Sequence, residues 1–186
     1  MYKLCKTEQS AVRQRELEKK LVELMSLRRY EEISVSDFCV FAEIPRKAFY
    51  RYFSSKDGAL YAVLDHTIMD YDFFHMPVVP DKVVDMQQEL ERFFQFWKNQ
   101  KPLLDSLANS GLSGILVERS IGNVAESVKN IQTQEDGKTR QHLVQFSVCG
   151  LMCMVVNWHA EGYGESVQEM SGIAARLLTQ PLLALK

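Results

Sequence analysis

The 186-residue sequence predicts an all-α fold. Apolar residues recur at steps of three and four over most of the chain, which is the spacing of one face of an α-helix. No segment shows a convincing strand-type alternation of apolar and polar residues. Capping residues and prolines divide the periodic segments into several helices, and two of these helices are short and adjacent.

The composition is that of a folded globular protein, with 46% hydrophobic and 25% charged residues. No run of about 18 consecutive apolar residues occurs, so no membrane-spanning helix is expected. Residues 1–20 contain no apolar core of signal-peptide length, so a cytoplasmic protein without a membrane partner is expected.

Charge is unevenly distributed along the chain. Residues 1–60 hold 12 Lys and Arg against 9 Asp and Glu, whereas the remainder holds 10 against 15. A basic front and an acidic rear suggest that only the front meets a polyanion.

The first two helices are expected within residues 10–44. From Ser10 to Leu27 the apolar positions form one stripe, which predicts an amphipathic helix. These positions are Leu17, Leu21, Leu24, Met25 and Leu27. Ser34, followed three residues later by Asp37, predicts a capping box and a short second helix. That helix is expected to bury Val35, Phe38 and residues 40–42.

A third short helix and a longer fourth helix follow. Pro45 suits a first turn, so the third helix is expected from Pro45 to about Tyr52 or Phe53. Ser54 or Ser55 offers a cap for a fourth helix over residues 56–74, and the two prolines in residues 75–81 predict a break.

Helical periods continue in the remaining chain. Helices are expected from Asp81 through Trp97, near residues 103–109, near 115–131 and over 167–178, with a polar loop at 133–138. The segment Leu143–Trp158 is apolar on nearly every side, which predicts a helix that is buried all round. A buried strand over residues 148–156 remains an alternative.

The third helix separates its residues into two faces. The inward face is apolar and consists of Ala48, Phe49, Tyr52 and Phe53. The outward face, here named the basic face, consists of Arg46, Lys47, Tyr50 and Arg51. Cations and a hydroxyl suit a phosphate backbone, and the helix N-terminus could present Arg46 to guanine. Ordinary solvated surface is the alternative interpretation.

Two short helices joined by a tight turn, with longer helices before and after, follow the helix-turn-helix plan. Residues from about Ala11 to Leu64 resemble the N-terminal domain of the TetR family of transcriptional regulators. The matching segments are "YEEISVSDFCVFAEI" and "FYRYFSSKDGAL". The second segment has an aromatic pair, a further Phe, a short polar turn, a Lys and an apolar helix start.

The resemblance implies two domains: a DNA-binding domain over residues 1–64, and a helical ligand-binding and dimerisation domain over 65–186. Residues 34–53 would form the helix-turn-helix. Arg46 and Lys47 would face base edges, and Ala48 could touch a thymine methyl group. The phosphate contacts would come from Ser36, Tyr50 and Lys56, and Arg51 of the basic face is a further candidate for DNA binding.

The sequence departs from the family pattern at three positions. Arg29 and Glu43 stand where the family usually has glycine, and Pro45 stands where a Ser or Thr cap is usual. A non-glycine residue in a left-handed conformation would destabilise the turn by about 1 kcal/mol.

The rear domain would hold an effector pocket and a dimer contact. Candidate pocket residues are Phe93, Phe94, Trp97, Leu104, His142, Phe146, Met152 and Trp158, with Asn157 as a further polar option. Ordinary core packing is the alternative for each of them. The last two helices present more apolar surface than a monomer can hide, and Gly150 would permit close approach in a homodimer. Two-fold symmetry would then predict a palindromic operator with half-sites about 34–36 Å apart.

The expected function is therefore a ligand-responsive, DNA-binding repressor that acts as a homodimer on double-stranded DNA, with an unknown small-molecule effector. A fold-related co-activator that docks on a partner protein is the alternative. No nucleophile–base pair, paired carboxylates or phosphate loop is visible, so an enzyme is not expected. No cofactor or metal site is expected either. Cys149 and Cys153 are interpreted as small buried apolar side chains, with a redox or metal role left open.

Overall fold

The computed structural model describes residues 2–3, 5–71, 86–127 and 137–179, and over these residues the protein is all-α, as predicted. Outside the helices, the described residues contain one isolated antiparallel bridge, between Tyr2 and Phe53. The chain divides into two compact units, residues 1–70 with 102–119 and residues 71–101 with 120–186. The expected boundary after residue 64 falls inside helix α4 (Lys56–Asp70).

The first helix of the first unit, α1 (Glu8–Leu27), begins after Thr7, whose hydroxyl accepts a hydrogen bond from the Ser10 amide at 3.2 Å. Four members of the predicted apolar stripe are buried, namely Leu17, Leu21, Leu24 and Met25. Leu27, the fifth member, is 70% exposed, so its predicted burial is wrong. It is the final residue of the helix, where the chain turns away into the next segment.

A one-turn 3₁₀ helix, η1 (Tyr30–Glu32), leads into α2 (Val35–Phe41). The predicted capping box is present: the Ser34 hydroxyl accepts from the Asp37 amide at 3.1 Å, and the Asp37 carboxylate accepts from the Ser34 amide at 2.8 Å. Phe38 is buried as expected, but Val40 is 79% exposed. Two residues turn a helix by about 200°, so Val40 faces away from Phe38.

The turn after α2 explains one departure from the family pattern. Glu43 has φ 53°, in the left-handed region, whereas Arg29 has φ -64° in an extended conformation. The Glu43 amide donates to the Val40 carbonyl at 3.2 Å and the Ile44 amide to the Cys39 carbonyl at 2.9 Å. These two bonds form a Schellman motif, in which glycine is the usual residue at the position of Glu43.

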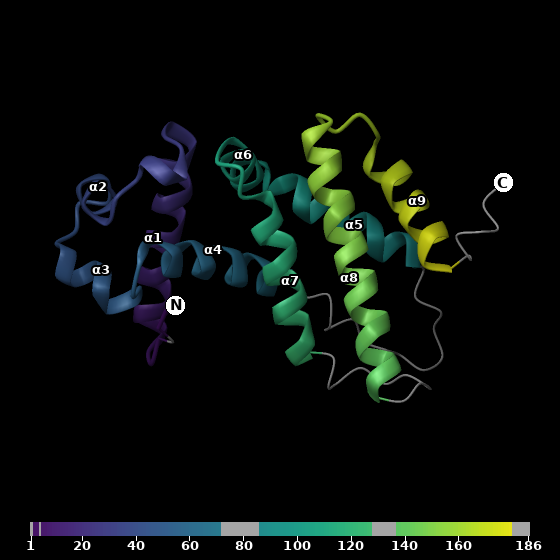
Figure 1. The fold of residues 1–186 in the computed structure, drawn as a ribbon, viewed down its shortest axis with the longest axis horizontal. Helices are drawn as coiled ribbons and strands as arrows, with labels where there is room; N and C mark the ends of the chain where they lie inside the picture. The colour runs from purple at the N-terminus through teal and green to yellow at the C-terminus, as the bar shows by residue number, and fades with distance from the viewer. Residues whose placement is uncertain (1, 4, 72–85, 128–136, 180–186) are drawn as a thin grey trace. The chain divides into compact units, whose positions relative to one another are not determined.

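Helix α3 (Arg46–Tyr52) follows this turn. Pro45 is its N-cap and provides no side-chain hydrogen bond, as its chemistry predicts. Helix α4 begins at Lys56, and the predicted Ser55 cap accepts a hydrogen bond from the Gly58 amide at 3.0 Å. Helix α1 packs against α2 and α4, and α2 packs against α3 (Figure 1).

The first unit also contains α6 (Lys101–Asn109) from Pro102 onward and the start of α7 (Ser113–Ser127), up to Arg119. The Ser110 hydroxyl accepts a hydrogen bond from the Tyr30 amide at 3.0 Å. The Arg119 guanidinium pairs with the buried Asp65 carboxylate of α4. Segments distant in the sequence therefore complete the first unit.

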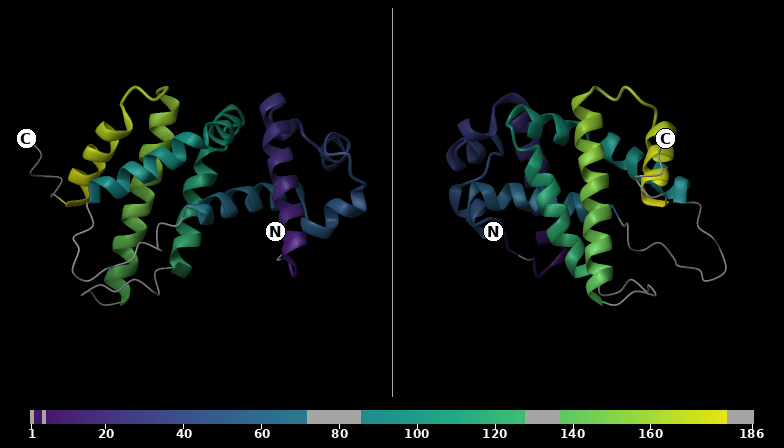
Figure 2. Two further views of the ribbon diagram at one scale, coloured as in Figure 1. Left: turned by 180° about the vertical axis from the view of Figure 1, so that it is seen from behind. Right: turned by 45° about the vertical axis from the view of Figure 1, so that its right-hand side comes forward.

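The second unit is built on α5 (Met86–Asn99), α8 (Gly137–Ala160) and α9 (Val167–Thr179). Helix α5 packs against both α8 and α9; it crosses behind α8 in Figure 1, and the same crossing is seen from behind in Figure 2. The strand alternative for residues 148–156 is wrong, because they lie within α8. The predicted break at 75–81, the start of the helix from Asp81, the end of the helix near 115–131 and most of the loop at 133–138 lie outside the described residues.

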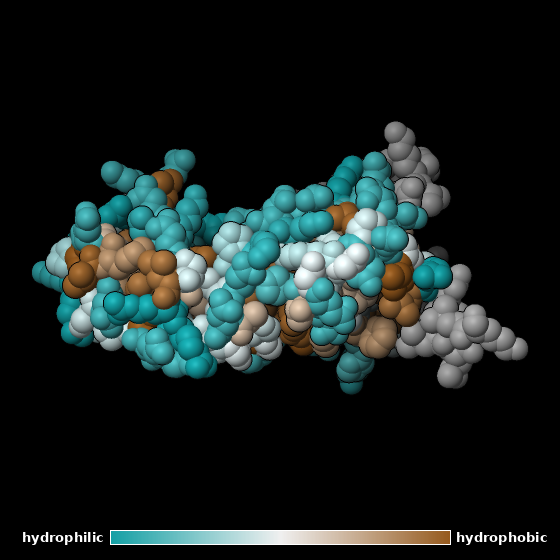
Figure 3. All heavy atoms as spheres, turned by 90° about the horizontal axis from the view of Figure 1, so that it is seen from above, coloured by the Kyte–Doolittle hydropathy of each residue, from teal (hydrophilic) through white to brown (hydrophobic). Residues whose placement is uncertain are grey.

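Helix α8 is not buried all round, contrary to the sequence prediction. Leu143 is 51% exposed and Phe146 is 65% exposed. Cys149 is half-buried and Cys153 is exposed, so the interpretation of both as buried side chains is also wrong. Patches of hydrophobic residues are visible among hydrophilic ones in the space-filling view (Figure 3). The physical reason is that α8 packs against α5 within a single chain, while a cavity separates part of α8 from α9.

One α8 segment, residues 141–160, is long and apolar enough to cross a membrane by length and composition alone. The prediction of no such segment relied on uninterrupted apolar runs, and the polar residues of α8 interrupt its run. A single helix of this kind is weak support for a membrane protein, because core helices of soluble proteins share these properties.

Candidate nucleic-acid interface

The inward face of α3 anchors it to the first unit. Phe49 and Phe53 are 1% and 0% exposed. The Phe49 ring centre lies 5.5 Å from that of Phe38 and 5.3 Å from that of Phe53. These edge-on and tilted ring pairs stabilise the contact between α2 and α3 beyond the burial of apolar area.

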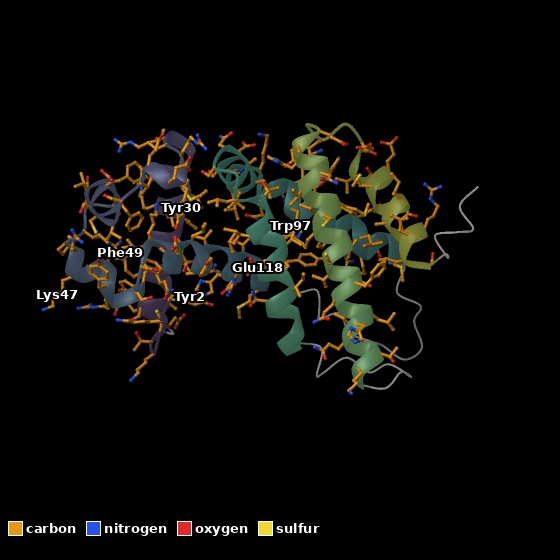
Figure 4. All side chains as sticks on the ribbon, viewed as in Figure 1. Tyr2, Tyr30, Lys47, Phe49, Trp97 and Glu118 are labelled. Atoms are coloured by element: carbon orange, nitrogen blue, oxygen red, sulfur yellow. The ribbon has the colours of Figure 1, made fainter. Side chains whose placement is uncertain are left out.

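The basic face lies on the opposite side, and all four of its residues are exposed. Figure 4 shows Lys47 on the outer side of α3 and Phe49 on its inner side. Neither Lys47 nor Arg51 forms a hydrogen bond or ion pair within the described part of the chain. Ala48 is half-buried at the edge between the two faces. Two exposed cations one helical turn apart are therefore available to an anionic ligand.

A hydrogen-bonded group joins the basic face to α2. The Arg46 guanidinium donates to the Ser36 hydroxyl at 3.0 Å and to the Tyr50 hydroxyl at 3.4 Å. The hydrogen bond with Tyr50 raises the pKa of Arg46 above its ordinary value. Because both hydroxyl oxygens accept from Arg46, their own protons can point outward, toward a phosphate oxygen.

Lys56 occupies a different environment from the basic face. Its ammonium donates to the Tyr30 carbonyl at 2.7 Å and lies 4.1 Å from the centre of the Tyr30 ring. The Tyr30 hydroxyl donates to the Asp57 carboxylate at 2.7 Å. Lys56 thus holds the start of α4 against η1, and its predicted phosphate contact remains a prediction.

Sequence reasoning missed the residues that support these elements from a distance. Arg119 and the segment around Lys3 make contacts with α4 and α3 that no local pattern indicates. One signal was present for Asp65: a single carboxylate within the apolar run "ALYAVLDHTIM" must be paired if it is buried.

Four of the eight predicted pocket residues lie in contact with one another through their rings, and all four belong to the second unit. Phe93, Phe94, Trp97 and Trp158 are buried and form a chain of ring contacts. The ring centres of Phe94 and Trp158 lie 5.7 Å apart, and those of Phe93 and Trp97 lie 6.4 Å apart. The Trp97 indole N–H is buried without a hydrogen-bond partner among the described residues.

The other candidates lie elsewhere. Met152 is buried on α8, whereas His142 and Phe146 are exposed on that helix. Leu104 is buried in α6, which belongs to the first unit. A cavity of about 130 Å³ lies between α8 and α9, lined by Phe146, Ser147, Gly150, Leu151, Met154, Ala174, Leu177 and Leu178. Within the described residues, no three His, Cys, Asp or Glu side chains gather in a group that could hold a metal ion.

Comparison with solved structures shows that the chain has the fold of TetR-type regulators. A TetR-family transcriptional regulator from Streptomyces coelicolor is 17% identical, with 90% of this chain and 79% of that one covered and a TM-score of 0.57. The TetR family repressor AlkX from Dietzia sp. strain DQ12-45-1b, implicated in biodegradation of n-alkanes, is 13% identical, with 87% and 91% covered and a TM-score of 0.57.

A third similar structure is the fatty acid degradation regulator FadR from Bacillus halodurans. It is 13% identical, with 91% of this chain and 95% of that one covered and a TM-score of 0.56. No protein-family model matches the sequence, and no curated protein matches it. The similarity therefore concerns the fold, and at these identities it does not extend to ligands or target sequences.

Proposed function

We propose that this protein is a ligand-responsive, DNA-binding transcriptional regulator: a cytoplasmic homodimer that represses transcription from a palindromic operator. One observation carries the proposal. The basic face holds two exposed cations, Lys47 and Arg51, on a helix that occupies the place of the reading helix in a helix-turn-helix. The fold shared with TetR-type regulators supports the same function.

The two parts of the basic face would have different roles on DNA. Lys47 and Arg51 are available to bind phosphate or base edges, and each phosphate contact releases counterions. Arg46 is already held by Ser36 and Tyr50, so these two hydroxyls are oriented to donate to the phosphate backbone. Phosphate contacts of this kind fix the register, and base contacts supply the specificity.

The exposed side of α8 supports the homodimer. Five exposed positions of α8 recur at steps of three and four, which is the spacing of a contact between two helices. They are Leu143, Phe146, Gly150, Cys153 and Asn157. A Cβ atom at Gly150 would meet nothing within 4 Å, so that position leaves room for a second helix. A second copy would bury this stripe, whereas Leu151, Val155 and Trp158 of α8 are already buried within their own chain.

The effector would bind in the second unit, beside the aromatic cluster of Phe93, Phe94, Trp97 and Trp158. The buried indole N–H of Trp97 is a donor that an acceptor group of an otherwise apolar ligand could satisfy. Binding would change the population of two conformations that differ at α4, which continues directly from the helix-turn-helix. DNA affinity and effector affinity would then change reciprocally.

Fluorescence anisotropy with DNA fragments from around its own gene tests this function. We expect Lys47→Ala and Tyr50→Phe to weaken binding to a palindromic site, and Lys19→Ala, which removes an exposed lysine of α1, to have little effect. Equal affinity of all four proteins would refute the assignment of the basic face. Failure of the unmodified protein to bind any such fragment would instead favour docking on a partner protein.

A further inference from the structure

Helix α3 is too short to hold its own orientation. It has seven residues, and isolated helices of that length are unstable in water. Its N-cap, Pro45, offers no side-chain acceptor. The orientation of the basic face therefore depends on contacts with other segments, including contacts at the C-terminal end of α3.

Lys3 provides such contacts at the C-terminal end. Its backbone amide donates to the Tyr52 carbonyl at 2.9 Å, and its ammonium donates to the Tyr50 carbonyl at 2.8 Å. Carbonyl groups of a last helical turn have no following turn to pair with. A cation at this end also interacts favourably with the helix dipole. One residue thus binds two carbonyls of the final turn of α3.

The segment that carries Lys3 is itself fixed to other helices. Tyr2 pairs with Phe53 in the antiparallel bridge, and its ring centre lies 5.2 Å from that of His66 on α4. The Cys5 thiol donates to the Gln14 side-chain oxygen of α1 at 2.8 Å. Lys3 is therefore attached to the framework formed by α1 and α4.

We infer that Lys3 is a positioning residue for the basic face: it ties the C-terminal turn of α3 to α1 and α4 and acts on DNA binding through α3. The inference rests on the proposed DNA binding. The ammonium of Lys3 is directed to a carbonyl oxygen of α3, and its geometry there is that of a helix cap. Its removal should loosen α3 and leave the phosphate contacts with DNA unchanged.

Two measurements on the full chain test the inference. Amide hydrogen exchange reports the local stability of α3, through the Phe53 amide, which donates to the Phe49 carbonyl at 3.0 Å. The salt dependence of DNA binding reports how many phosphates the protein neutralises. The variants are Lys3→Met, Lys3→Arg and, as a matched control, Lys6→Met, which removes an exposed lysine of the same segment.

For Lys3→Met we expect Phe53 exchange to become about two- to fivefold faster, the factor that corresponds to a cation at a helix C-terminus. DNA affinity should fall by at most this factor for each subunit, because it follows the fraction of molecules with α3 in place, and the slope of log K against log salt should not change. Lys3→Arg should retain both properties. Lys6→Met should leave the exchange rate of Phe53 unchanged.

Unchanged exchange in Lys3→Met would overturn the inference. A slope that became shallower by about 0.9 for each lysine removed would also overturn it, because that result means a direct phosphate contact. If the unmodified protein bound DNA without salt dependence, the proposed function would fail, and the exchange rates would still decide whether Lys3 holds α3.

Discussion

Arg119 of α7 and Asp65 of α4 form a bidentate ion pair in which the carboxylate is buried. The Arg119 Nε atom lies 2.7 Å from Asp65 Oδ1, and a second nitrogen bonds Oδ2. The Asp65 side chain is 3% exposed and that of Arg119 35%. The pair joins α4, the helix that follows α3, to a segment more than 50 residues away.

Removal of Arg119 should destabilise the first unit strongly. Arg119→Ala leaves the buried Asp65 carboxylate without its cation, and we expect the free energy of unfolding to fall by about 3 kcal/mol. This is the lower end of the range for buried pairs, because Arg119 is partly exposed. Urea denaturation measures this change in the free energy of unfolding. The double variant Asp65→Leu/Arg119→Met should recover most of that stability, and equal destabilisation in the two variants would contradict the role of the pair.

Replacement of Glu43 by glycine should stabilise the protein. Glu43 is in the left-handed region with φ 53°, which glycine adopts without strain. We expect Glu43→Gly to raise the free energy of unfolding by about 1 kcal/mol. Arg29→Gly is the matched control, since Arg29 has φ -64° and glycine there should destabilise. The same sign for both substitutions in thermal unfolding would refute this account of the turn.

The capping box of α2 should make stability depend on pH. Hydrogen bonds from the Ser34 side chain and backbone lower the pKa of Asp37 from its ordinary value of 3.8. The unfolded state therefore binds the proton more tightly, so the contribution of this carboxylate is present above pH 3.8 and is lost as the pH falls below it. We expect Asp37→Asn to lower the melting temperature at neutral pH and to differ less from the unmodified protein at about pH 3. A pH-independent difference would contradict this prediction.

A charge on the exposed stripe of α8 should separate the proposed dimer. Phe146 is 65% exposed in one chain, and a second copy would bury it. We expect Phe146→Glu to yield monomers in sedimentation velocity at concentrations where the unmodified protein is dimeric. Val40→Glu changes a residue of α2 that is 79% exposed and should leave the oligomeric state unchanged. Dimers in both variants would place the interface elsewhere.

Helices α1 to α4 of the first unit were predictable because their signals are local. The apolar stripe of α1, the Ser34–Asp37 capping box and the Ser55 cap act within one or two turns of the chain. The resemblance to TetR regulators rested on the same local segments, and the fold comparison agrees with it. The two faces of α3 follow from its helical period alone.

The supporting contacts could not be predicted, because they join residues that are distant in the sequence. The sequence around Lys3 does not indicate that its ammonium binds the Tyr50 carbonyl, and the sequence around Arg119 does not indicate that it pairs with Asp65. The predicted burial of α8 failed for a related reason. An apolar sequence indicates that a helix surface is buried in a contact, but it does not indicate whether the contact is within the same chain or with another chain.

The salt dependence of binding to the palindromic site tests the central claim most directly. For the unmodified dimer, log K should fall steeply and linearly with log salt concentration. Lys47→Ala/Arg51→Ala should bind more weakly, and its slope should be shallower by about 0.9 for every phosphate that the variant no longer neutralises. A flat dependence for the unmodified protein, or identical slopes for the two proteins, would contradict the assignment of the basic face as the DNA-binding surface.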